Sequence, residues 1–358
     1  MMENILYIGG FVLPDRNAAA QRVLAIAKGF RALGHRVVFL NYSDQVKDSH
    51  WTAYSEFDCY NMPKRGMYQH LTSIEDAVSI IEEKQITAVV AYNYPAVAMR
   101  KLISWCRKHE VKCYADATEW YVAQGNLIFR VIKTLDTEWR MRILHKKMDG
   151  VIAISDYLYQ YYKDCVNTVK IPPTVDTEDE KWQIQPIRHR DDTTVFVYAG
   201  SPTAQKERLD LILEAAETLR EKYSFVVRVI GITEEQYEAM YGKKAPAQCA
   251  HFLGRIPHQE VIREVTSADW SIIIRDTNKV VQAGFPTKVV ESISCGTPVI
   301  ANRFSNIADY LDESNSILCD QDSIAEAMEK ACNCMSLSVP NGSFDYREYI
   351  SALKQLGK

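Results

Sequence analysis

No apolar run in the 358 residues approaches the roughly 18 residues that cross a bilayer as a helix, so no membrane-spanning segment is expected. The first ten residues, MMENILYIGG, lack the basic stretch and apolar core of a secretory signal, which favours a cytoplasmic protein. Basic residues are not in excess, because 42 Lys and Arg stand against 46 Asp and Glu, for a net charge of −4. This balance argues against a nucleic-acid partner.

Several short motifs are missing as well. Neither GxGxxG nor GxxxxGK(S/T) occurs, which disfavours an NAD-dependent enzyme and a P-loop NTPase. The nine cysteines form no CxxC pair, and Cys332 and Cys334 have a spacing that suits zinc poorly. We therefore expect reduced, packed thiols and no zinc site.

Two stretches of the sequence follow one plan: a short apolar strand, a glycine turn, an amphipathic helix and a second strand. The first covers residues 4–40, with Gly9 and Gly10 at the turn, and the second covers 194–231, with Gly200 at the turn. Each is typical of a βαβ unit that opens a parallel sheet. At roughly 150 residues a domain, the length also indicates two domains. The sequence thus predicts an α/β protein of two Rossmann-like, doubly wound domains that face a central cleft.

The remaining apolar patterns fill in both domains. Further strands are predicted at 88–92, 111–115, 151–154, 251–253, 270–274 and 298–301, and further helices at 96–109, 289–294 and 323–332. The segment 170–193, Pro-rich at first and then polar, indicates the hinge. We expect an N-terminal domain over 1–170, a C-terminal domain over 171–342, and a final helix within 343–358 that packs back on the first domain.

The segment 282–301 carries the sharpest functional pattern. A Gly-Phe-Pro loop leads into a predicted helix, with Thr287 as its expected N-cap and Lys288 beside it. The amino end of a helix has unpaired N–H groups and a partial positive charge, so with Lys288 it would suit a diphosphate. Glu291, one turn later, would reach the sugar hydroxyls of a nucleotide. The alternative is a well-capped helix with Lys288 and Glu291 on its solvated face.

This segment resembles the C-terminal signature of glycosyltransferase family 4, whose members have the GT-B fold. In that signature, two glutamates separated by seven residues run into a helix that ends Cys-Gly-x-Pro-Val. Glu291 matches the second glutamate and residues 295–299 match the ending, whereas Ala283 stands at the first glutamate. Residues 199–206 resemble the family's phosphate loop, with Lys206 kept and Ser201 where arginine is usual. Residues 252–258 resemble the loop over the nucleobase.

The resemblance implies a retaining transfer of a sugar from a nucleoside-diphosphate sugar, with a UDP-sugar as the expected donor. The acceptor would be a glycan or a lipid diphosphate in surface polysaccharide synthesis. The donor would bind the C-terminal domain and the acceptor the N-terminal domain, with Glu291 on the ribose and the backbone at 255–256 on the base. The expected donor contacts are Gly10, Arg16, Gly200, Ser201, Arg255, Ile256, Gly284, Phe285, Pro286, Thr287, Lys288 and Glu291.

The expected catalytic groups follow from the leaving diphosphate. Its charge grows in the transition state, and one fixed donor aimed at such charge is worth ~3–4 kcal/mol. Lys206 and Lys288 would supply this, so we expect metal independence and no cofactor. Asp116 and Glu119 stand where the family often has a histidine and would orient the acceptor hydroxyl; a hydrogen-bonded turn is the alternative. Arg275 would replace the cation missing at Ser201, or be a surface salt-bridge residue.

Residues 130–147 combine basic and apolar side chains, with Trp139 among them. Such a helix suits peripheral contact with an anionic membrane, here at its inner face. Asp136 and Glu138 interrupt the pattern, which leaves a solvated helix face as the alternative. Arg16, in the loop 9–22, would meet an acceptor phosphate or the donor diphosphate.

Two other functions stay open at this point. Ala283 and Ser201 depart from the family pattern, as they would in a non-catalytic subunit that only binds nucleotide-sugars. A GT-B nucleotide-sugar epimerase is the third hypothesis.

Overall fold

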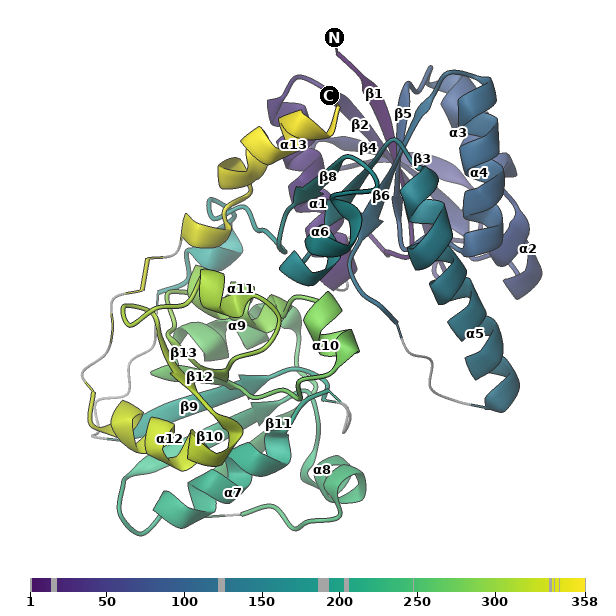
Figure 1. Ribbon diagram of the computed structural model, residues 1–358. Helices are drawn as coiled ribbons and strands as arrows, with labels where there is room; N and C mark the ends of the chain where they lie inside the picture. Colours follow the sequence, from purple (N-terminus) through teal and green to yellow (C-terminus); the bar gives the residue numbers. More distant parts are fainter. Residues whose placement is uncertain are drawn as a thin grey trace. The chain divides into compact units, whose positions relative to one another are not determined.

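The structure is a computed structural model that describes residues 2–357 except 14–17, 122–125, 186–192, 203–205, 247, 335, 336, 338 and 341 (Figure 1). It divides into two compact units. The first comprises Met1–Val175, Ala283–Phe285 and Tyr346–Lys358, and the second Asp176–Gln282 and Pro286–Asp345. Residues 171–175 therefore fall with the first unit, and the chain returns to that unit for its last segment.

The first unit is built on an eight-stranded sheet in the order β3-β4-β2-β1-β5-β6-β7-β8. Neighbouring strands are parallel except β3, which is antiparallel to β4. At the centre, Tyr7 of β1 lies beside Phe39 of β2 and Val90 of β5. The strands are β1 (Asn4–Gly9), β2 (Arg36–Ser43), β3 (His50–Tyr54), β4 (Phe57–Pro63), β5 (Ala88–Tyr92), β6 (Lys112–Ala117), β7 (Gly150–Ala153) and β8 (Thr168–Lys170).

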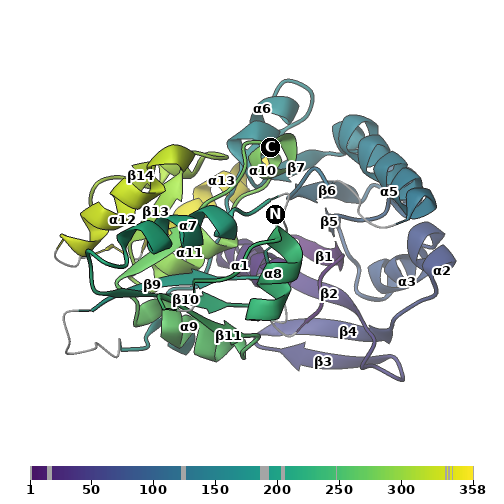
Figure 2. The same ribbon diagram turned by 90° about the horizontal axis from the view of Figure 1, so that it is seen from below.

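Helices cover both faces of this sheet, so its central strands are buried on both sides. Ile5 and Tyr7 pack in one core with α1 and α13, whereas Leu6 and Ile8 point to the opposite face. The helices are α1 (Ala18–Ala32), α2 (Met67–Thr72), α3 (Glu75–Glu83), α4 (Ala96–Lys108), α5 (Leu127–Trp139), α6 (Asp156–Tyr162) and α13 (Ile350–Leu356). Figure 2 shows α2, α3 and α5 along one side of the unit, and α5 continues as a π-helical turn, Arg140–Leu144.

The second unit has a six-stranded sheet in the order β11-β10-β9-β12-β13-β14, with every pair parallel. Its strands are β9 (Thr194–Ala199), β10 (Phe225–Ile230), β11 (Ala250–Gly254), β12 (Trp270–Ile273), β13 (Val299–Asn302) and β14 (Ser316–Cys319). Phe196 and Tyr198 of β9 pack in one core with helices α7 and α12, and Val195 and Val197 pack against the other side with α9.

Capping residues fix the ends of several helices of the second unit. At the start of α8, Thr233 Oγ1 accepts from Gln236 N at 3.3 Å, and Gln236 Oε1 accepts from Thr233 N at 3.0 Å. The same helix ends at Gly242, whose φ of 67° suits glycine. The helices are α7 (Leu209–Leu219), α8 (Glu234–Tyr241), α9 (His258–Thr266), α10 (Lys279–Ala283), α11 (Thr287–Ser294) and α12 (Ile324–Cys332).

The strand order places a topological switch point in each sheet. In the first unit the chain passes from β1 to β2 on one side and resumes with β5 on the other. In the second unit β9 leads to β10 on one side, and β12 lies on its other side. Ligands of doubly wound sheets bind outside the carboxyl ends of the strands at such points. The α/β fold of two doubly wound sheets predicted from the sequence is confirmed, although the β3–β4 hairpin was not predicted.

A buried ion pair closes the core of the first unit near the carboxyl ends of its strands. Arg22 of α1 donates from Nη2 to Asp116 Oδ1 at 2.7 Å and from Nη1 to the carbonyls of Ile171 and Pro172. Tyr7 donates to Asp116 Oδ2 at 2.6 Å, and burial followed by the charge of Asp116 raises the pKa of its hydroxyl. This network explains why residues 171–175 belong to the first unit.

Replacing Asp116 by Asn would leave the Arg22 guanidinium buried without its carboxylate. We expect the free energy of unfolding of the first unit to fall by ~3–5 kcal/mol, as for other buried pairs that lose one partner. Asp58→Asn breaks the exposed pair with Arg36 and should cost less than about 1 kcal/mol. Urea unfolding followed by tryptophan fluorescence measures both; a small, equal effect would contradict the assigned role of Asp116.

Candidate functional site

The switch point of the second unit brings together the segments that follow β9 and β12 and the first turn of α11. Gly200 and Ser201 directly follow β9, and Arg275 follows β12. Glu207 and Arg275 form an isolated antiparallel bridge that ties the two segments to each other. The residues that the sequence placed on a diphosphate therefore lie around one point of one sheet.

No side chain caps the amino end of α11. Pro286 is its N-cap, so Thr287 is the first helical residue and not the N-cap that the sequence predicted. Proline fits here because it has no N–H group to satisfy and cannot continue a preceding helix. The uncapped N–H groups and the helix dipole make this end suited to an anion.

The ammonium group of Lys288 points into the second unit and away from the solvent-exposed face of α11. Its Nζ donates to Tyr198 Oη at 3.0 Å and to Glu207 Oε2 at 2.5 Å, and it lies 4.3 Å from the centre of the Tyr198 ring. Burial lowers the pKa of Lys288 to about 8, against the opposing effect of Glu207. The solvated-face alternative for Lys288 is thus wrong, and its charge is shared with a carboxylate.

Gly200 has a reason for lacking a side chain that the sequence did not reveal. A Cβ on Gly200 would lie 2.0 Å from Lys288 Cε, and its φ of +153° is one that other residues rarely adopt. The lysine stem therefore occupies the space that a side chain at position 200 would need. The glycine turn after β9 both exposes backbone and admits Lys288.

Glu207 and Arg275 complete this arrangement. Arg275 Nη2 donates to Glu207 Oε1 at 2.8 Å, and its guanidinium lies 5.4 Å from the centre of the Phe304 ring. Although burial alone would raise it, Lys288 and Arg275 lower the pKa of Glu207 to about 2. Arg275 is 6% exposed, so it is a buried ion-pair residue rather than the surface one considered from the sequence.

The ribose and base contacts expected from the resemblance lie next to this point. Glu291 is on α11, and its Oε1 is 3.3 Å from His258 Nε2 at the start of α9. Arg255 is exposed and Ile256 half-buried, both directly after β11. Sequence reasoning missed His258, and only its place in the nucleobase loop could have pointed to it.

Lys206 and Ser201 lie on the edge of the same region. Ser201 is exposed and Lys206 is half-buried, and the carbonyl of Lys206 accepts from Asp276 N at 3.3 Å. The positive charge of Lys206 also contributes to lowering the pKa of Lys288. Residues 203–205 between them lie outside the described residues.

Known proteins resemble this chain over the same region and beyond it. Residues 179–338 match the family model described as Glycosyl transferases group 1. One component of the human phosphatidylinositol N-acetylglucosaminyltransferase is 20% identical over 349 residues, which cover 92% of this chain and 68% of that protein.

Two solved structures have the same fold across both units. Sucrose-phosphate synthase from Thermosynechococcus elongatus superposes with a TM-score of 0.70 at 14% identity, over 99% of this chain and 98% of that one. HepE from Anabaena, in complex with UDP and glucose, has a TM-score of 0.65 at 12% identity, over 99% and 98%. The chain therefore has the GT-B fold, as predicted from the sequence.

In the first unit, the two expected acceptor residues lie in different environments. Asp116 is fully buried, and its two oxygens accept from Arg22 and Tyr7. The expected contact between Asp116 and an acceptor hydroxyl is therefore wrong, because the carboxylate is enclosed and already paired. Glu119, beyond the end of β6, is half-buried and stays the candidate for that role.

The other expected contacts are spread over several segments. Gly10 is exposed at the end of β1, and its N–H donates to the carbonyl of Tyr92 at 3.1 Å. Gly284 and Phe285 group with the first unit, and Pro286 begins the next stretch of the second unit. Arg16 lies outside the described residues.

Within the described ranges, no group of three or more His, Cys, Asp or Glu side chains could hold a metal ion. The sequence does contain one Asp-x-Asp triplet, Asp320-Gln321-Asp322. Asp320 caps the short turn Gln321–Ser323 after the edge strand β14, with Ser323 Oγ accepting from its N–H at 3.3 Å. The position of Asp320 is thus explained by local capping.

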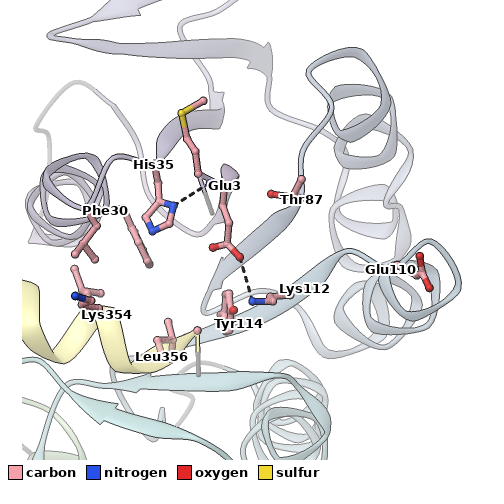
Figure 3. A pocket seen from close by; sticks show the side chains of 13 residues that line it. Glu3, Phe30, His35, Thr87, Glu110, Lys112, Tyr114, Lys354 and Leu356 are labelled. Carbon is pink, nitrogen blue, oxygen red and sulfur yellow. Dashed lines mark hydrogen bonds and ion pairs between the residues drawn. The ribbon is translucent and has the colours of Figure 1, made fainter.

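A cavity of about 630 Å³ in the first unit lies at the opposite ends of the strands, at the amino ends of β1 and β6 (Figure 3). Glu3 N donates to His35 Nδ1 at 3.0 Å, and Lys112 pairs with the Glu3 carboxylate at 3.2 Å across its wall. Because Gly10 and Glu119 follow the carboxyl ends of these strands, the cavity is separate from the predicted site residues.

Gly200→Ala tests the contact between Gly200 and Lys288. The added methyl group must displace the lysine stem, so we expect the second unit to lose ~1–3 kcal/mol of stability, as overpacked sites do. Gly342→Ala, in the same unit and with open space around it, is the matched control. Thermal unfolding of both variants measures the difference; equal melting temperatures would contradict the placement of Lys288.

Proposed function

We propose that this chain is a glycosyltransferase, which moves a sugar, with retention, from a UDP-sugar to a glycan or lipid-linked acceptor in surface polysaccharide synthesis. One observation carries the proposal: the uncapped amino end of α11 lies at the switch point beside two cations, Lys288 and Arg275. A diphosphate is the part of a nucleotide-sugar that such an arrangement favours.

The proposed contacts of the rest of the donor lie around this diphosphate site. The N–H groups of Thr287 and Lys288 and the Lys206 ammonium would hold the diphosphate, and Glu291 would accept from the ribose hydroxyls. The backbone at Arg255 and Ile256 would read the base. UDP is the preferred nucleotide because HepE was solved with UDP and glucose. The human relative, whose name gives N-acetylglucosamine as the sugar, supports a hexose-type donor.

The proposed chemistry follows from where charge develops. The bond between the anomeric carbon and the diphosphate oxygen breaks, and the acceptor oxygen forms a bond to the same face of that carbon. The acceptor proton passes to the departing phosphate, so no protein nucleophile is needed. Fixed lysine and N–H donors stabilise the diphosphate as its charge grows. These cations make a metal or cofactor unnecessary, and Glu119 would orient the acceptor hydroxyl.

Lys206→Ala and Glu291→Ala test the donor site. Each should lower transfer from a UDP-sugar at least a hundredfold while leaving the fold intact, since each removes a contact to the donor. Lys222→Ala, at an exposed ion pair with Glu329, is the control and should stay within twofold. Product formation is measured by chromatography and the fold by circular dichroism. Near-wild-type rates in both site variants would refute the assignment.

The same assays separate the rival functions. A non-catalytic subunit would bind UDP-sugars yet give no turnover across a panel of donors and acceptors. An epimerase would release UDP and a new sugar without an acceptor. Transfer to an added acceptor excludes both.

An exposed apolar surface on α5 supports the proposal of a lipid-linked acceptor. A surface helix of a globular protein normally buries its apolar stripe, yet five apolar side chains of α5 are exposed to between 42% and 73%. These residues are Leu127, Phe129, Val131, Ile132 and Leu135. Met67 and Tyr68 of α2 are also exposed, and α2 and α5 both pack against α4. Arg130 and Lys133 on α5 add positive charge.

This surface differs from the basic stretch expected at 130–147. Arg140, Leu144 and His145 are buried, so part of the second half of that stretch belongs to the core of the unit. Along the described chain, no helix is both long and apolar enough to cross a bilayer. We therefore place the peripheral membrane contact at α5 and α2, where apolar side chains would enter the interface and the cations would meet anionic lipids.

Replacing Leu127, Ile132 and Leu135 together by Ser tests this contact. The triple variant should bind vesicles of phosphatidylglycerol at least tenfold more weakly than the wild type, because the apolar area that enters the interface is lost. Leu253→Ser, an exposed leucine of the second unit, is the control. Co-sedimentation measures binding. Undiminished binding by the triple variant, or equal binding of pure phosphatidylcholine vesicles by the wild type, would contradict the proposal.

A further inference from the structure

Ser201 stands where the resemblance leads one to expect an arginine on the diphosphate. The structure offers another source of charge at the same switch point, formed by Tyr198, Glu207, Arg275 and Lys288. These four residues, called the Glu207 cluster below, come from β9, from the segments after β9 and β12, and from α11. Their side chains lie largely inside the unit, the most exposed being Lys288 at 12%.

The charges of the Glu207 cluster do not cancel. Glu207 is the one carboxylate that pairs with either Lys288 or Arg275 among the ion pairs of the described residues. Tyr198 remains neutral, since burial and then the charge of Glu207 raise the pKa of its hydroxyl. Two cations and one anion leave one positive charge in excess.

A buried charge in excess is costly, and a purely structural role does not explain it. Buried ion pairs are often replaced by apolar residues with little loss of stability, so even balanced pairs are not retained for stability alone. Here the excess is a cation, and the Nε atom of Arg275 is also buried without a hydrogen-bond partner in the described part of the chain. An anionic ligand would remove the imbalance.

The position of the Glu207 cluster indicates which anionic ligand would bind near it. The Lys288 stem passes directly under the backbone of Gly200, the turn after β9. Lys288 is also the second residue of α11, whose uncapped N–H groups face the proposed diphosphate. At such short range and low dielectric, one unit charge interacts strongly with a diphosphate even without direct contact.

We propose that the excess positive charge of the Glu207 cluster takes the place of the arginine missing at Ser201 and holds the donor diphosphate. Arg275 is then a positioning residue that acts through Glu207 and through the net charge, and Glu207 sets that charge at one. This inference rests on the proposed function and assigns a role to residues outside the family signature.

Binding of UDP to variants with different cluster charge tests the proposal. Arg275→Gln brings the charge to zero and should weaken UDP binding at least tenfold. The double variant Arg275→Gln with Glu207→Gln returns the charge to one and should bind within about threefold of the wild type. Arg275→Lys keeps the charge and should behave likewise. Isothermal titration calorimetry measures affinity at low ionic strength, where charge effects are least screened.

Arg228→Gln is the matched control, because Arg228 pairs with Glu264 at 2.7 Å in the same unit but away from the switch point. It should leave the affinity for UDP within twofold of the wild type. Thermal unfolding checks that each variant folds. If Arg275→Gln fails to fold, the single variant Glu207→Gln tests the proposal instead. It raises the net charge of the Glu207 cluster to two and should tighten UDP binding at least threefold.

Three results would overturn the inference: wild-type affinity in Arg275→Gln, a double variant that binds as weakly as Arg275→Gln, or weaker binding by Glu207→Gln alone. The second would mean that Arg275 acts through structure and not through charge. A wild-type protein that binds no nucleoside diphosphate would instead refute the proposed function. If the wild type binds UDP and Lys206→Ala loses it while Arg275→Gln does not, only this inference fails.

Discussion

The ion pairs that Glu207 makes with Lys288 and Arg275 are the interaction on which the second unit's site depends. They join the segments after two neighbouring strands to the first turn of α11, so the sheet fixes where that helix begins. The glycine turn after β9 is shaped by the same contact, because Lys288 fills the space beside Gly200. The proposed anion site thus depends on these buried ion pairs.

The first unit has a comparable buried ion pair, but the net charge of its members is different. Arg22 and Asp116 cancel each other, and the arginine also donates to two backbone carbonyls. Such a balanced, saturated network fixes the fold and leaves nothing for a ligand. The second unit's cluster keeps one cation in excess, as a site for an anion requires. The two sheets therefore carry buried ion pairs of different net charge near their switch points.

The sequence predicted those strands and helices that hydrophobic periodicity and glycine turns indicate. The strand expected at 88–92 coincides with β5, because a continuous apolar run with β-branched residues is typical of a buried parallel strand. The β3–β4 hairpin was missed because its residues are half-exposed and alternate irregularly. Asp116 was misjudged because its partner Arg22 is 94 residues away, a distance at which local patterns carry no information. For the same reason Glu207, next to Lys206, gave no sign of its partners.

The core of the first unit contains residues from both ends of the described chain. Leu353 and Leu356 of α13 pack with Ile5, Tyr7 and α1, and the side chain of Leu353 sits directly against Gly29. Because this core includes α13, the first unit can complete it only after residues 350–356 have been synthesised, although its first strand is at the start of the described chain.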